Sequence, residues 1–225
     1  MACTAAGLLT ELRHVANPSA YPNRHYRGAA AILGVRMGTL FEIAKRHQEI
    51  PLAEVAKLLD QAEYEPRLAA FCVLDFQVRR ARISDQERQE HYQLYFDRHD
   101  AIDSWDMVDR AAPRVVGAFL RDRSRRPLFE LAESSDPLRR RTAMIAPLAY
   151  VRPAHQEGIA DLLRLAELLA ADPDPVVSKP VGIALKHAGA AAPDQVRAFL
   201  DRMGDQLPAP VRRQARAKLP AVDGN

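Results

Sequence analysis

The only tryptophan of the chain, Trp105, stands among three aspartates at three-residue intervals, Asp103, Asp106 and Asp109. Asp103 can cap the N-terminus of a helix that begins here, and Asp106 is well placed to return a capping interaction. Asp109 lacks such a role, and its i, i+4 spacing from Trp105 predicts that both side chains project from one helix face. A carboxylate beside an indole suits a cationic ligand or a positive charge that develops during a reaction. The alternative interpretation is a core tryptophan beside a surface ion pair.

Other common chemical motifs are missing from the sequence, which has no glycine-rich phosphate loop, no His-Glu-x-x-His and no Cys-x-x-Cys. His91 and His99 lie two helical turns apart and are expected to pack between repeats or lie at the surface. The two cysteines, Cys3 and Cys72, predict neither a structural disulfide nor a thiol nucleophile. We therefore expect no metal and no organic cofactor.

The charge of the chain is nearly balanced, with 32 basic and 29 acidic residues and a net charge of +3. The basic residues nevertheless gather in three islands, at 110–126, 139–141 and 211–219. These islands favour one positive face that could meet phosphates. A solvated surface of mixed charge is the alternative.

Length and composition are those of a globular protein, with 225 residues, 48% hydrophobic and 27% charged. No apolar run approaches the roughly 18 residues of a membrane span, and the first fourteen residues lack the features of a secretory signal. We expect a cytoplasmic protein.

Apolar residues recur every three or four positions, and no period-two strand is evident, so the pattern predicts an all-α chain of short helices. The helices are expected at 40–47, 52–59, 68–81, 85–97, 104–120, 127–133, 137–150, 158–170, 175–187, 193–203 and 210–219. Turn signals near residues 66, 103, 136, 174 and 208 recur at intervals of about 34 to 38 residues, the length of a helical-hairpin repeat. Such hairpins bury their apolar faces by stacking, so we predict a curved α-solenoid of HEAT-like repeats. It would form a single domain, 1–225, with residues 1–20 and 220–225 at the periphery.

Four segments, in this order, resemble the AlkD-like DNA alkylation repair glycosylases, which are HEAT-like solenoids. They are Leu33–Arg46, Ser104-Trp-Asp-Met-Val-Asp, Arg140-Arg-Thr-Ala and Lys179-Pro-Val-Gly. The resemblance covers roughly residues 20 to 220 and implies excision of cationic N3- or N7-alkylated purines from duplex DNA, so that the protein is expected at the nucleoid when it is bound to DNA. Separately, we expect the protein to be a monomer. It leaves open whether small methyl lesions or bulky adducts are preferred.

The resemblance also implies roles for individual residues. Asp109 matches the catalytic aspartate, Trp105 matches a cleft tryptophan, and Arg141 matches an arginine that holds a phosphate. The remaining DNA-binding candidates, taken from the motifs and the basic islands, are Arg140, Lys179, Arg36, Tyr26, Arg212 and Arg213. The family's second cleft tryptophan is replaced here by Ile183, and a HEAT-repeat module that binds DNA or protein without catalysis is therefore the alternative function.

Overall fold

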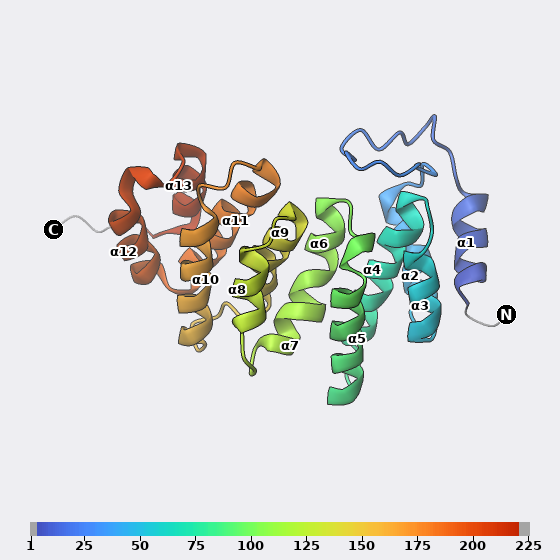
Figure 1. Ribbon diagram of the computed structural model, residues 1–225, viewed down its shortest axis with the longest axis horizontal. Helices are drawn as coiled ribbons and strands as arrows, with labels where there is room; N and C mark the ends of the chain where they lie inside the picture. Colours follow the sequence, from blue (N-terminus) through green and yellow to red (C-terminus); the bar gives the residue numbers. More distant parts are fainter. Residues whose placement is uncertain (1–3, 221–225) are drawn as a thin grey trace. The chain divides into compact units, whose positions relative to one another are not determined.

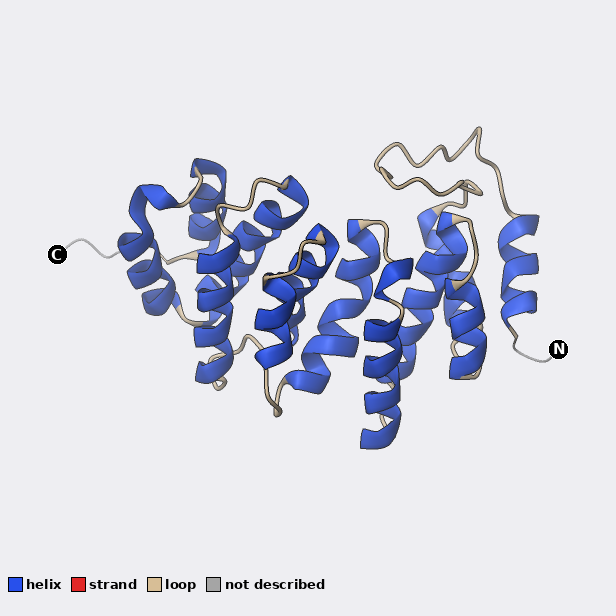
Figure 2. Cartoon of the chain, in the orientation of Figure 1, coloured by secondary structure: helices blue, strands red, loops and turns tan. Residues whose placement is uncertain are grey.

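Every regular element in residues 4–220, the part of the chain that the computed structural model describes, is helical (Figure 2). The predicted all-α fold is confirmed. The chain divides into two compact units, Met1–Phe119 and Leu120–Asn225, and each is described below by itself. The expectation of a single domain remains a prediction.

The first unit is built around α4 (Figure 1), in which thirteen of fifteen residues are buried. Its helices are α1 (Ala5–His14), α2 (Met37–Arg46), α3 (Leu52–Leu59), α4 (Tyr64–Val78), α5 (Asp85–Asp97) and α6 (Trp105–Ala111), with a 3-10 turn at His99–Ala101. Helix α4 contacts α1, α2, α3, α5 and α6. A helix that is covered on all sides carries no polar face for solvent, and α4 is therefore the core of this unit.

Helix α1 was not expected, because residues 1–20 were placed at the periphery. Thr4 caps this helix by accepting a hydrogen bond from the Gly7 amide, at 3.2 Å. Leu8 and Leu12, one turn apart on the same face, have no exposed surface. The described part of this segment thus contributes to the core of the first unit.

The single helix expected at 104–120 is interrupted by a π-helical segment, Ala112–Gly117, between α6 and α7 (Ala118–Leu120). Pro113, near its start, has no N–H and cannot donate to the carbonyl of Asp109, four residues earlier. Single π-helical turns inside α-helices frequently lie at functional sites. This interruption directly follows the helix that carries Trp105 and Asp109.

The second unit is centred on α11, which contacts α9, α10, α12 and α13 (Figure 1). Its helices are α8 (Arg126–Ala132), α9 (Pro137–Ile145), α10 (Gln156–Leu169), α11 (Pro175–Ala191), α12 (Pro193–Met203) and α13 (Ala209–Ala215), with 3-10 turns at Ala146–Ala149, Gly204–Gln206 and Arg216–Lys218. Asp136 caps α9 and Asp174 caps α11, and each accepts a hydrogen bond of 2.8 Å from the amide two residues ahead. The Asp-Pro segments at the turn signals near 136 and 174 therefore begin helices that are capped in the same way.

Candidate active site

Helix α6 presents Trp105 and Asp109 on a different side from its buried residues. Met107, Val108 and Ala111 are buried, and α6 packs on α4. Trp105 is 42% exposed and Asp109 is half-buried. Since positions i and i+4 share a helix face, the indole and the carboxylate form one partly solvent-exposed patch.

The predicted capping role of Asp103 is wrong. The N-cap residue of α6 is Ser104, and no side chain caps the helix. Asp103 instead accepts a hydrogen bond from the Arg67 guanidinium of α4, at 2.6 Å, and another from the Tyr26 hydroxyl. The charge-assisted hydrogen bond from a guanidinium is stronger than one from a backbone amide, so the Asp103 carboxylate bonds to Arg67 and does not cap α6.

The predicted capping role of Asp106 is also wrong. Its Oδ2 accepts a hydrogen bond from the hydroxyl of Tyr64, the first residue of α4, and its Oδ1 accepts one from the adjacent Met107 amide, at 3.0 Å. Tyr64 itself is buried. Both aspartates that flank Trp105 thus tie the first turn of α6 to other elements of the first unit.

The two tyrosines that donate to these aspartates lie against each other, with ring centroids 4.5 Å apart. Burial and the hydrogen bond to Asp103 raise the pKa of Tyr26 to about 12. Burial and the nearby charge of Asp106 raise the pKa of Tyr64 further. Both phenols therefore keep their protons at neutral pH and remain donors to the carboxylates.

Tyr26 reaches Asp103 from the long loop between α1 and α2, residues 15–36 (Figure 1). The buried carboxylate of Glu65 anchors the end of this loop by accepting hydrogen bonds from the amides of Leu33, Gly34 and Val35, at 2.7, 2.8 and 3.3 Å. Gly34 has a φ of +74° and packs on Pro18, a position that no side chain could take without strain. Loops of this length are often functional, and this one is held in place by α4.

Arg110 holds the last turn of α6, directly after Asp109. Its guanidinium lies 4.9 Å from the ring centre of Phe41 and 4.7 Å from that of Phe76. It also pairs with the buried Asp75 of α4, at 3.1 Å. The first arginine of the first basic island is therefore an internal residue of the first unit, and it restrains the backbone that carries Asp109.

The sequence analysis missed three residues at the start of α4, namely Tyr64, Glu65 and Arg67. Their signal was present as Tyr-Glu-Pro-Arg, a polar beginning to an otherwise apolar helix. Each of them forms a hydrogen bond with a segment that is distant in sequence, and such partners cannot be predicted from local spacing.

In the second unit, Arg141 and Arg140 of α9 both contact the α11 region. Arg141 is 6% exposed, and its Nη1 donates to the carbonyl of Val176 at 2.7 Å. Arg140 binds both oxygens of Asp172, at 2.6 and 3.2 Å. Arg140 is thus engaged within this unit, where it joins successive repeats.

The other predicted residues of the second unit differ in exposure. Lys179 is exposed and Ile183 is half-buried, both on α11. Arg213 of α13 is exposed, whereas Arg212 pairs with Asp205 and donates to the carbonyl of Gly204 at 3.1 Å. Several further island arginines also pair with acids of their own unit: Arg121 with Asp122, Arg125 with Asp161 and Glu157, and Arg126 with Glu130. For these paired arginines, the alternative interpretation of a solvated surface of mixed charge applies.

Comparison with known proteins places the chain. A family described as DNA alkylation repair enzyme matches residues 8–219. The chain belongs to this family. Membership gives it a role in the repair of alkylation damage and makes DNA its substrate. No curated protein matches the chain.

Two solved structures share the fold of this DNA alkylation repair family member. The first, titled a predicted DNA alkylation repair enzyme from Enterococcus faecalis, has a TM-score of 0.64 and 14% identity over 97% of this chain and 95% of its own. The second, smu.31 from Streptococcus mutans UA159, has a TM-score of 0.57 and 18% identity over 82% of this chain and 93% of its own. At such identities, the likeness concerns the fold alone.

Within residues 4–220 of this family member, no group of three or more histidine, cysteine, aspartate or glutamate side chains could hold a metal ion. His91 and His99 are buried. None of the helices in this range is both long and apolar enough to cross a membrane.

Proposed function

We propose that the chain is a DNA glycosylase that removes cationic N3- or N7-alkylated purines from duplex DNA. An alkylated purine carries a positive charge and is a good leaving group. The C1′–N bond breaks, and its electron pair leaves with the base, which becomes neutral. A water oxygen then bonds to C1′, and the proton that it loses passes to a carboxylate or to solvent.

Asp109 is the proposed catalytic residue. The sugar becomes cationic as the glycosidic bond breaks, and a fixed carboxylate beside it stabilises that charge. The same carboxylate can orient the attacking water and accept its proton. The anchoring of α6 by Arg110 and by the two flanking aspartates supports this role, because a preorganised charge loses little free energy to reorientation.

Trp105 is the proposed wall for the sugar and the cationic lesion. An exposed indole costs free energy in water unless it meets a ligand, and its face attracts a cation by about 0.5–2 kcal/mol. Arg141 is proposed to bind a DNA phosphate, as the resemblance implies. Ile183 is smaller than an indole, which favours the acceptance of bulky adducts.

The observation that carries this proposal is the pairing of an exposed tryptophan with a half-buried aspartate one helical turn away, in a chain of the alkylation repair family. Neither side chain belongs to the apolar face of α6. The two side chains therefore lie outside the buried contact surface of α6.

The decisive experiment is single-turnover excision of 7-methylguanine from duplex DNA by the wild type and by Asp109→Asn. The substitution keeps the size of the side chain and deletes its charge, so we expect a loss of about two to three decades in rate, equal to roughly 3–4 kcal/mol. Duplex affinity should change little, because phosphates are bound by other residues.

Asp106→Asn is the matched control, since it removes the same charge one turn away on the same helix. It should excise within a few-fold of the wild-type rate. An unchanged rate in Asp109→Asn would overturn the catalytic assignment. A wild type without activity on any cationic lesion would instead favour the binding-module alternative.

A further inference from the structure

The loop between α1 and α2 carries positive charge without any acidic residue. Residues 15–36 contain Arg24, Arg27, Arg36 and His25 but no aspartate or glutamate. Among the ion pairs between residues 4 and 220, none uses any of these three arginines. This distinguishes the loop from the basic islands, where several arginines are neutralised within their own unit. The loop therefore presents positive charge that is available to an anionic ligand.

The same loop and Tyr64 of α4 line an open pocket. The pocket has a volume of about 580 Å³ and is lined by residues 19–25, by residues 35–37 and by Tyr64. Ligand sites in proteins commonly measure about 300–1,000 Å³, and the volume of this pocket lies within that range. Arg24, His25 and Arg36 are among the lining residues.

Exposed apolar side chains accompany these charges. Tyr21 and Met37 line the pocket and are 43% and 37% exposed. Together with Trp105, they make up three of the five large hydrophobic side chains that are exposed among the described residues. A flat ring and a thioether beside unpaired guanidinium groups match a ligand with an aromatic part and a negative charge.

We propose that this pocket binds an unpaired nucleotide of the DNA substrate. Its base would stack on Tyr21 and contact Met37, and its phosphates would bind Arg24 and Arg36. Aromatic side chains within a positive groove are the usual means of holding unpaired bases, because every base has a π face. The inference rests on the proposed function in taking damaged DNA as the ligand, and it adds a site that holds a nucleotide away from the carboxylate of Asp109.

The pocket is joined to the candidate active site through Tyr64. This residue lines the pocket, and its hydroxyl donates a hydrogen bond to Asp106, the neighbour of Trp105. On the pocket side, Asn23 also lines the pocket and adopts a left-handed backbone conformation with φ of 37°. A nucleotide in the pocket would thus lie against the side chain that fixes the first turn of α6.

The test compares the affinity of the full chain for two labelled duplexes of equal length by fluorescence anisotropy at fixed salt. One duplex is fully paired, and the other contains a single unpaired adenosine. We expect the wild type to favour the second by about tenfold, since stacking of one base on an aromatic side chain has about this effect. Tyr21→Ala should abolish the preference, and Tyr21→Phe, which retains the ring, should keep it.

Arg36→Ala should weaken binding of the unpaired duplex and reduce the slope of log K against log salt by about 0.7 to 0.9, the value for one phosphate. Two matched controls remove equivalent groups elsewhere. Arg152→Ala removes an exposed arginine, and Leu168→Ala removes an exposed apolar side chain of the second unit. Both should retain the wild-type preference.

The outcomes separate this inference from the proposed function. Equal affinity of the wild type for both duplexes, or a preference that survives Tyr21→Ala, would overturn the pocket, whether or not the protein excises bases. A preference that depends on Tyr21 in a protein without excision activity would support the pocket and overturn the glycosylase. Asp109→Asn should lose excision and keep the preference.

Discussion

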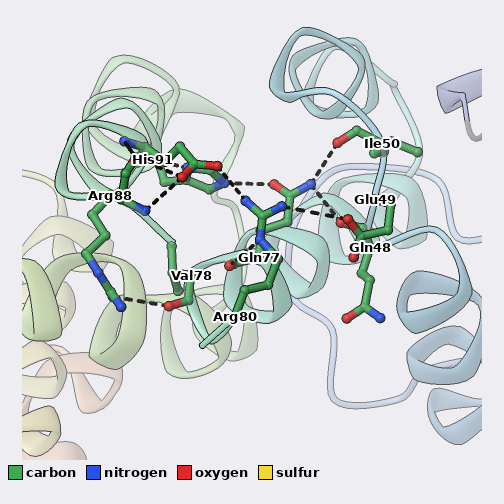
Figure 3. A network of polar contacts seen from close by, with 10 residues as sticks. Gln48, Glu49, Ile50, Gln77, Val78, Arg80, Arg88 and His91 are labelled. Carbon is green, nitrogen blue, oxygen red and sulfur yellow. Dashed lines mark hydrogen bonds and ion pairs between the residues drawn. The ribbon is translucent and has the colours of Figure 1, made fainter. Parts of the chain in front are cut away.

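Side-chain hydrogen bonds connect both ends of α4 to other segments of the first unit, but only one end lies beside the candidate active site. At the N-terminal end, Tyr64, Glu65 and Arg67 bond to the loop and to the aspartates beside Trp105. At the C-terminal end, Gln77 bonds to the α2–α3 connection and to His91 of α5 (Figure 3). Each end joins three segments of the first unit.

The C-terminal network is closed to solvent. Gln77 Nε2 donates to the carbonyls of Gln48 and Ile50, at 2.9 and 2.7 Å. Its Oε1 lies 2.8 Å from His91 Nε2, while His91 Nδ1 lies 2.6 Å from the carbonyl of Glu87. Gln77 and His91 are 3% and 4% exposed, and the network therefore holds helices together without meeting a ligand.

The N-terminal network continues to a partly exposed face. Asp103 and Asp106 are only half-buried, and Trp105 between them is 42% exposed. The comparison shows that the density of hydrogen bonds does not by itself mark a functional site. The N-terminal end of α4 differs because its hydrogen bonds end at carboxylates beside an exposed aromatic side chain. The buried amide network at the C-terminal end contributes to stability alone.

The largest effect on folding is expected from Glu65→Ala. It leaves three backbone amides without their acceptor, and the free energy of unfolding should fall by about 3–5 kcal/mol. Because the loop that carries Tyr26 is released, excision below the melting temperature should fall as well. Urea denaturation and single-turnover excision measure both effects, and Glu65→Gln, which keeps an acceptor oxygen, should lose less. Wild-type stability in Glu65→Ala would contradict the anchoring role.

Gln77→Ala should destabilise the other end of α4 by about 2–3 kcal/mol, because two carbonyls and His91 lose buried partners. Excision by the folded protein should remain at the wild-type rate. Urea denaturation measures the loss of stability, and single-turnover excision is measured at a temperature where the variant is fully folded. A reduced excision rate there would show that the two ends of α4 are not separate in function.

Asp106→Asn should have a smaller effect, a loss of about 1 kcal/mol of stability. The amide oxygen can still accept from Tyr64, but this hydrogen bond no longer has a charged acceptor, and the Met107 amide loses its side-chain acceptor. Thermal denaturation of Asp106→Asn, of Tyr64→Phe and of the double variant tests whether the loss comes from this hydrogen bond. If the two substitutions combined cost the sum of the single losses, the hydroxyl and the carboxylate would not be coupled.

The smallest effects concern pH, and the two ends should respond at opposite extremes. Burial lowers the pKa of His91 below its ordinary value of about 6.5, so stability from the C-terminal end is present above that pH and is lost as the pH falls. Tyr26, with its pKa raised to about 12, contributes stability that is complete below about pH 10 and is lost as the pH rises towards 12. Urea denaturation between pH 5 and 11 should show that His91→Gln flattens only the acid limb and Tyr26→Phe only the alkaline one.

Local signals in the sequence determined the helices and much of their placement. The helix expected at 85–97 is α5 (Asp85–Asp97), and its start is set by a capping box between Ser84 and Glu87. The Asp-Pro segments at 136 and 174 begin helices as predicted. The shared helix of Trp105 and Asp109 likewise follows from their spacing. Such features depend on contacts within four residues, and a sequence displays them directly.

Only the tertiary structure decided what the polar residues around this helix do. Asp106 looks like a capping residue by its spacing, but its partner Tyr64 lies 42 positions away in the chain. Asp103 accepts hydrogen bonds from Tyr26, 77 positions away, and from Arg67. A carboxylate bonds to whichever donors the fold brings to it, and a buried or charge-assisted donor outcompetes a backbone amide that water can also satisfy. The choice among partners is therefore a property of the packed unit, which no local pattern encodes.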